Sequence, residues 1–492
     1  MRKIYKVCSY SNFKMKLCFV SLNQNRGDTY PMGLLSLMSY INSIKDLSIE
    51  MTLIDANFEK NVLQKIIEAK PDIIGISAMT IEYGQAIDLA KELKKQLNVP
   101  IIVGGVHIST LPTSLHASFD IGVIGEGEET ILELIKIYSK KNEFLIEDLK
   151  SVKGIVFHNF GQKIINESRG FLELDSFPIW DRTLLNPGYF RPKRMHTGKS
   201  GICETIMTTR GCPYNCRFCS TKSFWKKVRF HSPRRVVDEI KYIYELHKLD
   251  YIIIWDDLFT IDRERIKEII HLLDEEGLLG KISFGCNLRV NLVDENLCNL
   301  LKELNVVYVG FGFESGSDKV LQWLKKDNSL TAQQNREAAK LCKDSGFIVE
   351  GSLIFGSPGE TIEDMKKTLK LIDYFIKIKL DNVWSFTLTP FPATEAWEIA
   401  KKRNKVNDYD MDWDILSLHN INEPLLLDKS ITKNQFMEIF LESRRKLKYF
   451  KWQKIKKDLI NGNILHMIKN TLKNPKLLTN LIFKKHTVAE AK

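Results

Sequence analysis

The chain has 492 residues, 44% of them hydrophobic and 27% charged, with a formal net charge of +11. This length and composition exclude a single small domain and predict two or three sizeable cores. Six of the nine cysteines are scattered and no secretory leader precedes them, which disfavours a disulfide framework. The apolar run at residues 17–22 is too short for a signal sequence or a membrane span, so we expect a cytoplasmic protein.

Short apolar runs alternate with helical stretches from residue 16 to about residue 139. The predicted strands cover residues 17–22, 51–56, 73–78, 100–105 and 121–125. This alternation predicts a doubly wound, Rossmann-like parallel sheet with helices on both faces. Glycines and small residues follow the strand ends, where such sheets bind ligands. Residues 1–150 are therefore predicted to form a binding domain.

A connector is predicted over residues 151–200. It begins with a hairpin, from strands at 154–158 and 162–166, and continues with an acidic, proline-containing segment at 171–180. Its composition is that of a link between two modules more than that of a core.

A second strand–helix alternation occupies residues 201–395. The predicted strands cover residues 204–210, 251–257, 282–287, 306–314, 348–356 and 382–391. Six strand–helix repeats predict a partial (β/α)6 barrel, whose chemistry is expected at the carboxyl ends of the strands.

Cys212, Cys216 and Cys219 form a CxxxCxxC motif just after the first strand of this barrel. At the cysteine frequency of this chain, such spacing would arise by chance only about 0.003 times. Three thiolates on one loop can hold three irons of a four-iron four-sulfur cluster and leave the fourth iron open to a small ligand. The alternative is a zinc site, for which His231 is the nearest fourth ligand.

The positive charge is concentrated in the C-terminal region, residues 396–492, which is predicted to be helical. Residues 443–492 contain 14 Lys and Arg residues against two acidic residues, interleaved with apolar residues near helical spacing. Such a helix packs on the body of the protein with a solvated lysine face, or lies on an anionic membrane surface. No recognition motif accompanies the charge, so nucleic acid is not expected.

The cysteine loop, with Phe218 before Cys219, resembles that of the radical S-adenosylmethionine superfamily, whose core is a partial barrel of this kind. The resemblance implies a bound cluster and S-adenosylmethionine, and it assigns no further catalytic residue. It implies that acids and glycines at later strand ends hold S-adenosylmethionine: Asp256 and Asp257 its amino group, Glu314 and Ser315 its ribose, and the Gly356, Pro358 and Gly359 loop its adenine.

Residues 1–150 resemble the cobalamin-binding fold of mutases and methionine synthase. In that fold an Asp-x-His-xx-Gly loop supplies the lower cobalt ligand, and here Tyr30 stands at the histidine position, between Asp28 and Gly33. The resemblance therefore implies cobalamin without a protein imidazole beneath the cobalt, with His107 as the alternative ligand. It further implies contacts from Ser77, Gly104 and Gly105, and from Gly125, Glu126 and Gly127.

The two modules together resemble the cobalamin-binding radical S-adenosylmethionine family across residues 16–395. The resemblance implies C-methylation of an unactivated carbon, with cyclisation or other oxidoreductase chemistry as the alternative. A non-catalytic cobalamin-binding protein would not need the three cysteines, and a methylthiotransferase would carry a second cysteine set upstream. Expected partners are a small-molecule or lipid-like substrate, an external electron donor of flavodoxin or ferredoxin type, and, through the basic tail, the inner face of the membrane.

Overall fold

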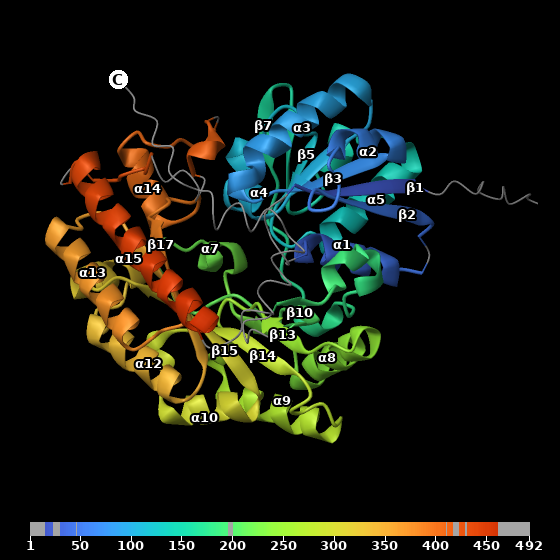
Figure 1. Ribbon diagram of the computed structural model, residues 1–492. Helices are drawn as coiled ribbons and strands as arrows, with labels where there is room; N and C mark the ends of the chain where they lie inside the picture. Colours follow the sequence, from blue (N-terminus) through green and yellow to red (C-terminus); the bar gives the residue numbers. More distant parts are fainter. Residues whose placement is uncertain are drawn as a thin grey trace, which may run out of the picture.

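The computed structural model describes residues 15–22, 30–45, 47–194, 200–409, 411–416, 423–428 and 431–460 (Figure 1). Two sheets built mainly from parallel strands organise these residues, one following the other along the chain. The predicted fold class is thereby confirmed: a doubly wound domain, then a six-stranded partial barrel, then a helical region.

The first sheet has, among the described residues, seven strands in the order β2-β1-β3-β4-β5-β6-β7. Strands β1 to β5 are parallel, whereas β6 and β7 join antiparallel through a turn at Phe160 and Gly161, both with positive φ. The hairpin expected in the connector thus extends this sheet. The strands are β1 (Met15–Ser21), β2 (Ile49–Asp55), β3 (Ile73–Ser77), β4 (Ile101–Gly104), β5 (Ile121–Val123), β6 (Ile155–Asn159) and β7 (Gln162–Ile165).

Alternating side chains of the parallel strands enter two different cores, one on each face of the sheet. In β1, Leu17 and Phe19 pack on one side, while Cys18 and Val20 pack on the other. The first side is covered by α1 (Met32–Ser43), α5 (Glu128–Lys141) and α6 (Ile146–Leu149), and the second by α2 (Val62–Ala69), α3 (Tyr83–Gln96) and α4 (Val106–Thr110). The apolar runs in the sequence therefore correspond to strands that helices cover on both faces of the sheet.

The second sheet is entirely parallel, with the strand order β10-β13-β14-β15-β16-β17 among the described residues. Its strands are β10 (Cys203–Ile206), β13 (Tyr251–Ile254), β14 (Ser283–Leu288), β15 (Val306–Glu314), β16 (Ile348–Phe355) and β17 (Asn382–Thr387). The helices are α7 (Thr221–Trp225), α8 (Pro233–His247), α9 (Arg263–Glu275), α10 (Glu295–Glu303), α11 (Asp318–Lys325), α12 (Ala332–Asp344), α13 (Ile362–Lys377), α14 (Glu395–Lys402) and α15 (Lys433–Ile460).

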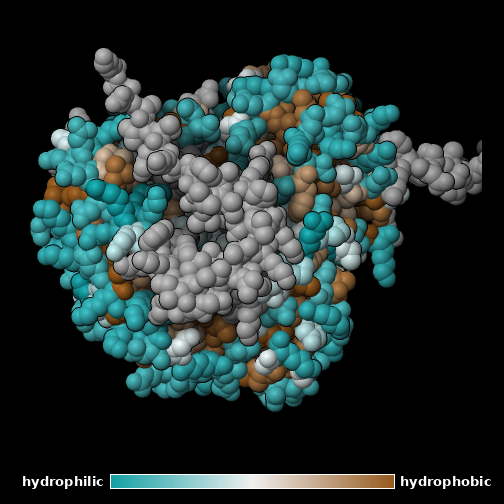
Figure 2. All heavy atoms as spheres, viewed as in Figure 1, coloured by the Kyte–Doolittle hydropathy of each residue, from teal (hydrophilic) through white to brown (hydrophobic). Residues whose placement is uncertain are grey.

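Most barrel helices begin at a residue whose side chain accepts a backbone N–H of the first turn. Ser232, Asp262 and Asp294 cap α8, α9 and α10, and Thr331 and Thr361 form capping boxes at α12 and α13. These caps determine the residue at which each helix begins after the loop that follows its strand. Figure 2 shows that hydrophilic residues dominate the outer helices of the barrel on the face in view.

The shorter elements lie mainly in the connector and at the loops that close the barrel. Two small antiparallel pairs are β8 (Lys193–Arg194) with β9 (Ser200–Gly201), and β11 (Thr209–Arg210) with β12 (Arg229–Phe230). The 3-10 helices are η1 (Thr80–Glu82), η2 (Pro112–Ser114), η3 (Leu174–Ser176), η4 (Arg182–Leu184), η5 (Pro187–Phe190), η6 (Phe259–Ile261), η7 (Val290–Leu292) and η8 (Trp413–Leu416).

The C-terminal region packs on both modules. Trp397 of α14 and Trp413 of η8 join the core beside α3, where Trp413 meets Tyr83 edge to face. Helix α15 instead packs its first half on α13 and β17, with Ser443 bonded to Ser385. This contact agrees with a helix packed on the body, while residues 461–492 of the basic tail lie outside the described residues. Among the residues that the structure describes, no helix is long and apolar enough to cross a bilayer.

A fully buried arginine, Arg182, joins the two modules at the connector. Its guanidinium pairs with Glu239 of α8 at 2.6 Å and donates to the carbonyl oxygen of Thr205 in β10 at 3.3 Å. It also lies 3.4 Å from the hydroxyl of Tyr30, which itself donates to the Thr205 carbonyl at 2.5 Å. The start of the first domain is thus fastened to the first strand of the barrel.

Candidate functional site

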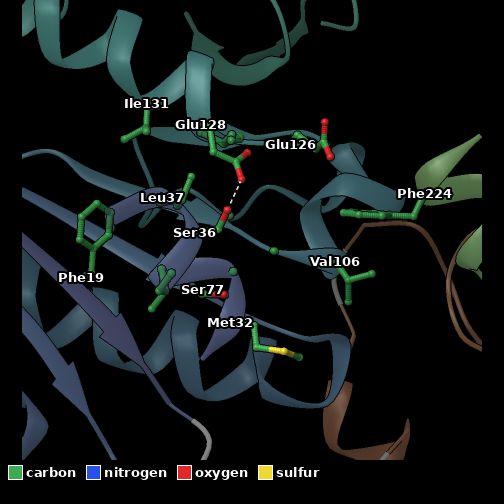
Figure 3. Close-up of a pocket in the computed structure, with 18 of the residues that line it drawn as sticks. Phe19, Met32, Ser36, Leu37, Ser77, Val106, Glu126, Glu128, Ile131 and Phe224 are labelled. Carbon is green, nitrogen blue, oxygen red and sulfur yellow. Dashed lines mark hydrogen bonds between the residues drawn. The ribbon is translucent and has the colours of Figure 1, made fainter. Parts of the chain in front are cut away.

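A largely apolar cavity lies between the carboxyl edge of the first sheet and the segment that follows β10 (Figure 3). Figure 3 shows Phe19, Met32 and Ser77 of the first domain on one side and Phe224 of α7 on the other. The wall from the first domain includes seven predicted residues: Gly33, Ser77, Gly104, Gly105, Gly125, Glu126 and Gly127. The wall from the barrel side and the connector was not predicted: Trp180, Met207, Arg210, Phe224 and Trp225.

Glycines give this cavity its shape. Gly105 has φ +101°, and a Cβ there would lie 2.6 Å from the carbonyl oxygen of Ala78, so no other residue fits without a backbone shift. Gly125 has φ +81°, and its N–H donates to Ser109 at 2.9 Å. At Gly33, in the first turn of α1, a Cβ would meet nothing within 4 Å. The loops after β4 and β5 therefore approach a ligand with backbone alone.

Tyr30 and His107 do not line the cavity. Tyr30 is buried against the connector, with its hydroxyl bonded to Thr205 as described above. His107 is fully buried, stacked on Tyr83 with centroids 3.8 Å apart, and bonded to Ser114 at 2.9 Å. Burial lowers the pKa of His107 to about 3, so its imidazole is neutral. Both side chains are held in packing positions away from the ligand space.

Two buried arginines face two glutamates between the cavity and the cysteine loop. Arg210 forms an ion pair with Glu126 and lies 3.6 Å from Glu128, while Arg229 pairs with Glu126 at 2.7 Å. Ser36 of α1 donates to Glu128 at 2.6 Å (Figure 3). Arg210 lies two residues before Cys212, so this cluster links the cavity wall directly to the loop.

The three cysteine thiols, all free and partly exposed, lie on the loop between β11 and α7. Burial raises the pKa values of Cys212 and Cys219. Among the described residues, no three His, Cys, Asp or Glu side chains are grouped as a single metal ion would require. His231, the fourth ligand that a zinc site would need, instead lies 2.9 Å from Asp175. The loop therefore offers three thiols, and His231 is not available to them as a fourth ligand.

Asp256 and Asp257, at the end of β13, hold the ends of the cysteine loop. Asp256 is buried and accepts the backbone N–H groups of Thr208 and Thr209 at 2.6 and 3.0 Å. Asp257 accepts the N–H of Gly211 at 3.1 Å and the hydroxyl of Thr221 at 3.0 Å. Burial raises the pKa of both carboxyl groups, against these hydrogen bonds. Both carboxylates thus hold this segment, and Asp257 is the one that lies near the Cys212 and Cys219 thiols.

Glu314 is the last residue of β15. Its link to the cysteine loop is Lys325, a residue that the sequence did not predict. The Glu314 backbone has φ +59°, and its buried carboxylate pairs with Lys325 at 2.7 Å. The Lys325 ammonium lies 5.5 Å from the ring centroid of Phe218. Ser315 is fully buried and bonded to Thr368 at 3.0 Å, inside the turn. The structure brings Glu314 to the loop and turns Ser315 inward.

The loop after β16 presents its backbone at the same edge of the sheet. Gly356 has φ +87° and donates its N–H to Glu360 at 2.6 Å. Gly359 has φ +75° and donates to Asp428 at 2.9 Å, while Pro358 is half-buried. Burial raises the pKa of Glu360 to about 7. The buried Glu360 side chain holds the loop in place, and the open side of the loop presents backbone groups.

Comparison with known proteins assigns the chain to a family. Residues 206–372 match the radical SAM superfamily and residues 22–135 match the B12 binding domain. An uncharacterized methyltransferase of Pyrococcus horikoshii is 31% identical over 83% of this chain and 85% of its own length. The chain belongs to the cobalamin-binding radical S-adenosylmethionine enzymes. Its cofactors are therefore a four-iron four-sulfur cluster, S-adenosylmethionine and cobalamin.

Two further proteins show the range of this enzyme family. An anaerobic magnesium-protoporphyrin IX monomethyl ester cyclase of Cereibacter sphaeroides is 27% identical over 79% of this chain and 61% of the cyclase. The solved structure of TsrM, a radical S-adenosylmethionine methyltransferase from Kitasatospora setae, has a TM-score of 0.66 and 19% identity, covering 79% of this chain and 76% of TsrM. The similarity to TsrM concerns the fold alone.

The residues of this radical S-adenosylmethionine enzyme fit both resident cofactors. Three thiols on one loop are the donor set of a cluster with one open iron. The cradle of glycines around Gly105, which a Cβ would fill, suits a large flat ligand approached by backbone. Sequence reasoning missed Arg210, Arg289 and Lys325. Arg210 ends β11 and Arg289 directly follows β14, the same signal that identified Asp257 and Glu314. Lys325 ends helix α11, where no such signal exists.

Proposed function

We propose that this enzyme methylates an unactivated carbon of a small molecule. One observation supports this most: residues 207–225 form both the cysteine loop and one wall of the glycine-lined cavity. A methyl donor in that cavity and a radical source at the loop would be served by a single short segment. Cyclisation remains the second candidate, because a relative that covers much of this chain is a cyclase.

The proposed site divides the work among the residues already described. Cys212, Cys216 and Cys219 would hold the cluster, while Asp257, Glu314 and the Gly356–Gly359 backbone would hold S-adenosylmethionine. Cobalamin would be held by the cavity wall of the first domain. When bound, these cofactors supply radical generation and methyl transfer. The chain keeps Tyr30 and His107 in packing positions, which supports cobalamin without a histidine beneath the cobalt.

The two candidate reactions differ in the fate of S-adenosylmethionine. Methylation consumes it in two ways, as a radical source that yields 5′-deoxyadenosine and as a methyl donor that yields S-adenosylhomocysteine. We expect anaerobically reconstituted, reduced enzyme to form both products, and S-adenosylhomocysteine only when cobalamin is present. Chromatography with mass detection measures both. Formation of 5′-deoxyadenosine without any S-adenosylhomocysteine would favour the cyclase, and absence of both would contradict the family chemistry.

Gly33 offers a separate test of the proposed cobalamin site. Gly33 lines the cavity and a Cβ there meets nothing within 4 Å, so Gly33→Phe can direct its ring into the ligand space. We expect cobalamin affinity to fall by roughly 100-fold, or about 2.8 kcal/mol. Gly33→Ala is the matched control: it adds one methyl group and stabilises α1 by about 0.5–1 kcal/mol. Absorbance titration with hydroxocobalamin measures both. Equal affinities for the two variants would place cobalamin elsewhere.

We also propose partners for this enzyme. A small-molecule substrate agrees with the methyltransferase relative, and a lipid-like one is the narrower alternative. An external donor of flavodoxin or ferredoxin type would supply electrons to the cluster. Membrane contact, if made, would involve residues beyond the first half of α15, because that half packs on the barrel. Liposome co-sedimentation of the full chain would test this contact.

A further inference from the structure

We propose that Arg289 raises the reduction potential of the iron–sulfur cluster by donating a hydrogen bond to the sulfur of Cys216. Arg289 directly follows β14, and its Nη1 lies 3.6 Å from Cys216 Sγ. The inference rests on the proposed cluster ligands. It assigns Arg289 as a positioning residue, because it acts through Cys216 and not on the substrate.

The guanidinium is fixed by contacts on every other side. Its Nε donates to Asn291 at 2.9 Å and its Nη2 pairs with Asp327 at 3.2 Å. Its plane lies over the ring of Tyr214, with the central carbon 3.7 Å from the ring centroid. With those partners satisfied, the Nη1 edge is the one that faces the sulfur. A rigid fork of this kind holds its donor in place more firmly than a lysine ammonium.

Burial strengthens the electrostatic effect of Arg289 on the Cys216 sulfur. Arg289 is only 7% exposed, so water screens its charge weakly. One electron from an external donor adds negative charge to the cluster, and part of that charge rests on the ligand sulfurs. A cation that donates an N–H to one of these sulfurs stabilises the reduced state more than the oxidised state. Hydrogen bonds to cluster sulfurs are an established determinant of cluster potential.

The first measurement is a redox titration of the reconstituted holoenzyme, followed by electron paramagnetic resonance. In Arg289→Gln the charge is lost, and we expect the ratio of reduced to oxidised cluster, at the wild-type midpoint potential, to fall about 10-fold. That ratio corresponds to a midpoint lowered by about 59 mV for one electron. An unchanged midpoint in protein with full iron content would overturn the proposal, because a role limited to holding the loop leaves the potential unmoved.

A second variant keeps the test decisive if Arg289→Gln loads too little iron. Arg289→Lys retains the charge, but one ammonium cannot bond Asn291, Asp327 and Cys216 together. We expect a smaller decrease of the midpoint in the same direction, and a wild-type midpoint with full iron would again overturn the proposal. Arg263→Gln is the control: Arg263 is partly exposed and pairs with Asp294 at 2.9 Å, and its loss should leave the midpoint unchanged.

The Arg289 inference can fail separately from the cluster assignment on which it rests. Cys216→Ala with full iron and a wild-type midpoint would show that Cys216 is not a ligand. Loss of iron in Cys216→Ala, together with an unchanged midpoint in fully loaded Arg289→Gln, would refute only the role of Arg289.

Discussion

Cys219→Ala is expected to abolish reductive cleavage of S-adenosylmethionine while leaving cobalamin binding intact. The variant removes one of three thiols that lie on a single loop, and among the described residues no group of metal-binding side chains stands ready to replace it. We expect 5′-deoxyadenosine formation to fall by roughly 1,000-fold or more, because an incomplete cluster loses its open, ligand-binding iron. The cavity wall from the first domain does not include Cys219, so absorbance titration should show unchanged cobalamin affinity.

Cys203→Ala is the matched control for this variant. Cys203 is partly exposed and lies in β10 of the same barrel, outside the cysteine loop. Its removal should leave iron content and 5′-deoxyadenosine formation near the wild-type values. Substantial activity in Cys219→Ala, or equal losses in the two variants, would contradict the assignment of the loop.

Arg182→Met is expected to destabilise the protein by about 3–5 kcal/mol at neutral pH, because it leaves a buried carboxylate without its principal partner. Arg182 is fully buried and pairs with Glu239 at 2.6 Å. Burial opposes ionisation of Glu239, yet Arg182 and Arg235 outweigh burial and lower its pKa. Urea denaturation followed by circular dichroism measures the loss.

The pH dependence separates this electrostatic cost from lost packing. In the wild type, the lowered pKa of Glu239 gives stability that is present above the unfolded pKa, about 4.3, and is lost as pH falls through the folded value. Removing Arg182 removes that contribution, so the difference between variant and wild type should shrink below about pH 4.3. A difference that is constant with pH would indicate a packing defect alone.

Arg234→Met provides the control on the same helix. Arg234 is exposed and pairs with Asp238 and Glu276, each at 2.6 Å, so water screens these ion pairs and its replacement should cost far less than that of Arg182. The double variant Arg182→Met with Glu239→Gln should recover part of the loss, since the buried Glu239 side chain then carries no charge, and only part, because Arg235 loses the same partner.

The fold could be predicted from the sequence because strand periodicity and helix spacing are local signals. Each of the eleven parallel strands in the described part of the chain begins or ends within a few residues of its predicted bounds. The hairpin of β6 and β7 was also visible as a hairpin, but its attachment to β5 was not. Local pattern specifies that two strands pair with each other; which sheet edge they join depends on distant residues.

Individual site residues were harder to predict, because position at a strand end does not fix a side chain's partner. Asp256 and Asp257 are adjacent in sequence, yet the first is enclosed by Thr208 and Thr209. Tyr30 stands at the expected place in the motif, but its hydroxyl reaches Thr205, 175 residues away. Arg289 belongs to no sequence motif. Its role depends on its contacts with Cys216, Tyr214 and Asp327, which only the fold creates.

The C-terminal residues that cover the first domain are synthesised long after that domain. Trp397 and Trp413 complete the core beside α3, which means that the first domain leaves the ribosome with an apolar face that its own sequence cannot cover. That face stays open until about 250 further residues have been added. Contacts so distant along the chain form slowly and leave partly folded chains prone to aggregation. We expect the nascent enzyme to depend on chaperones, and its B12 domain to reach its final form only once the barrel is finished.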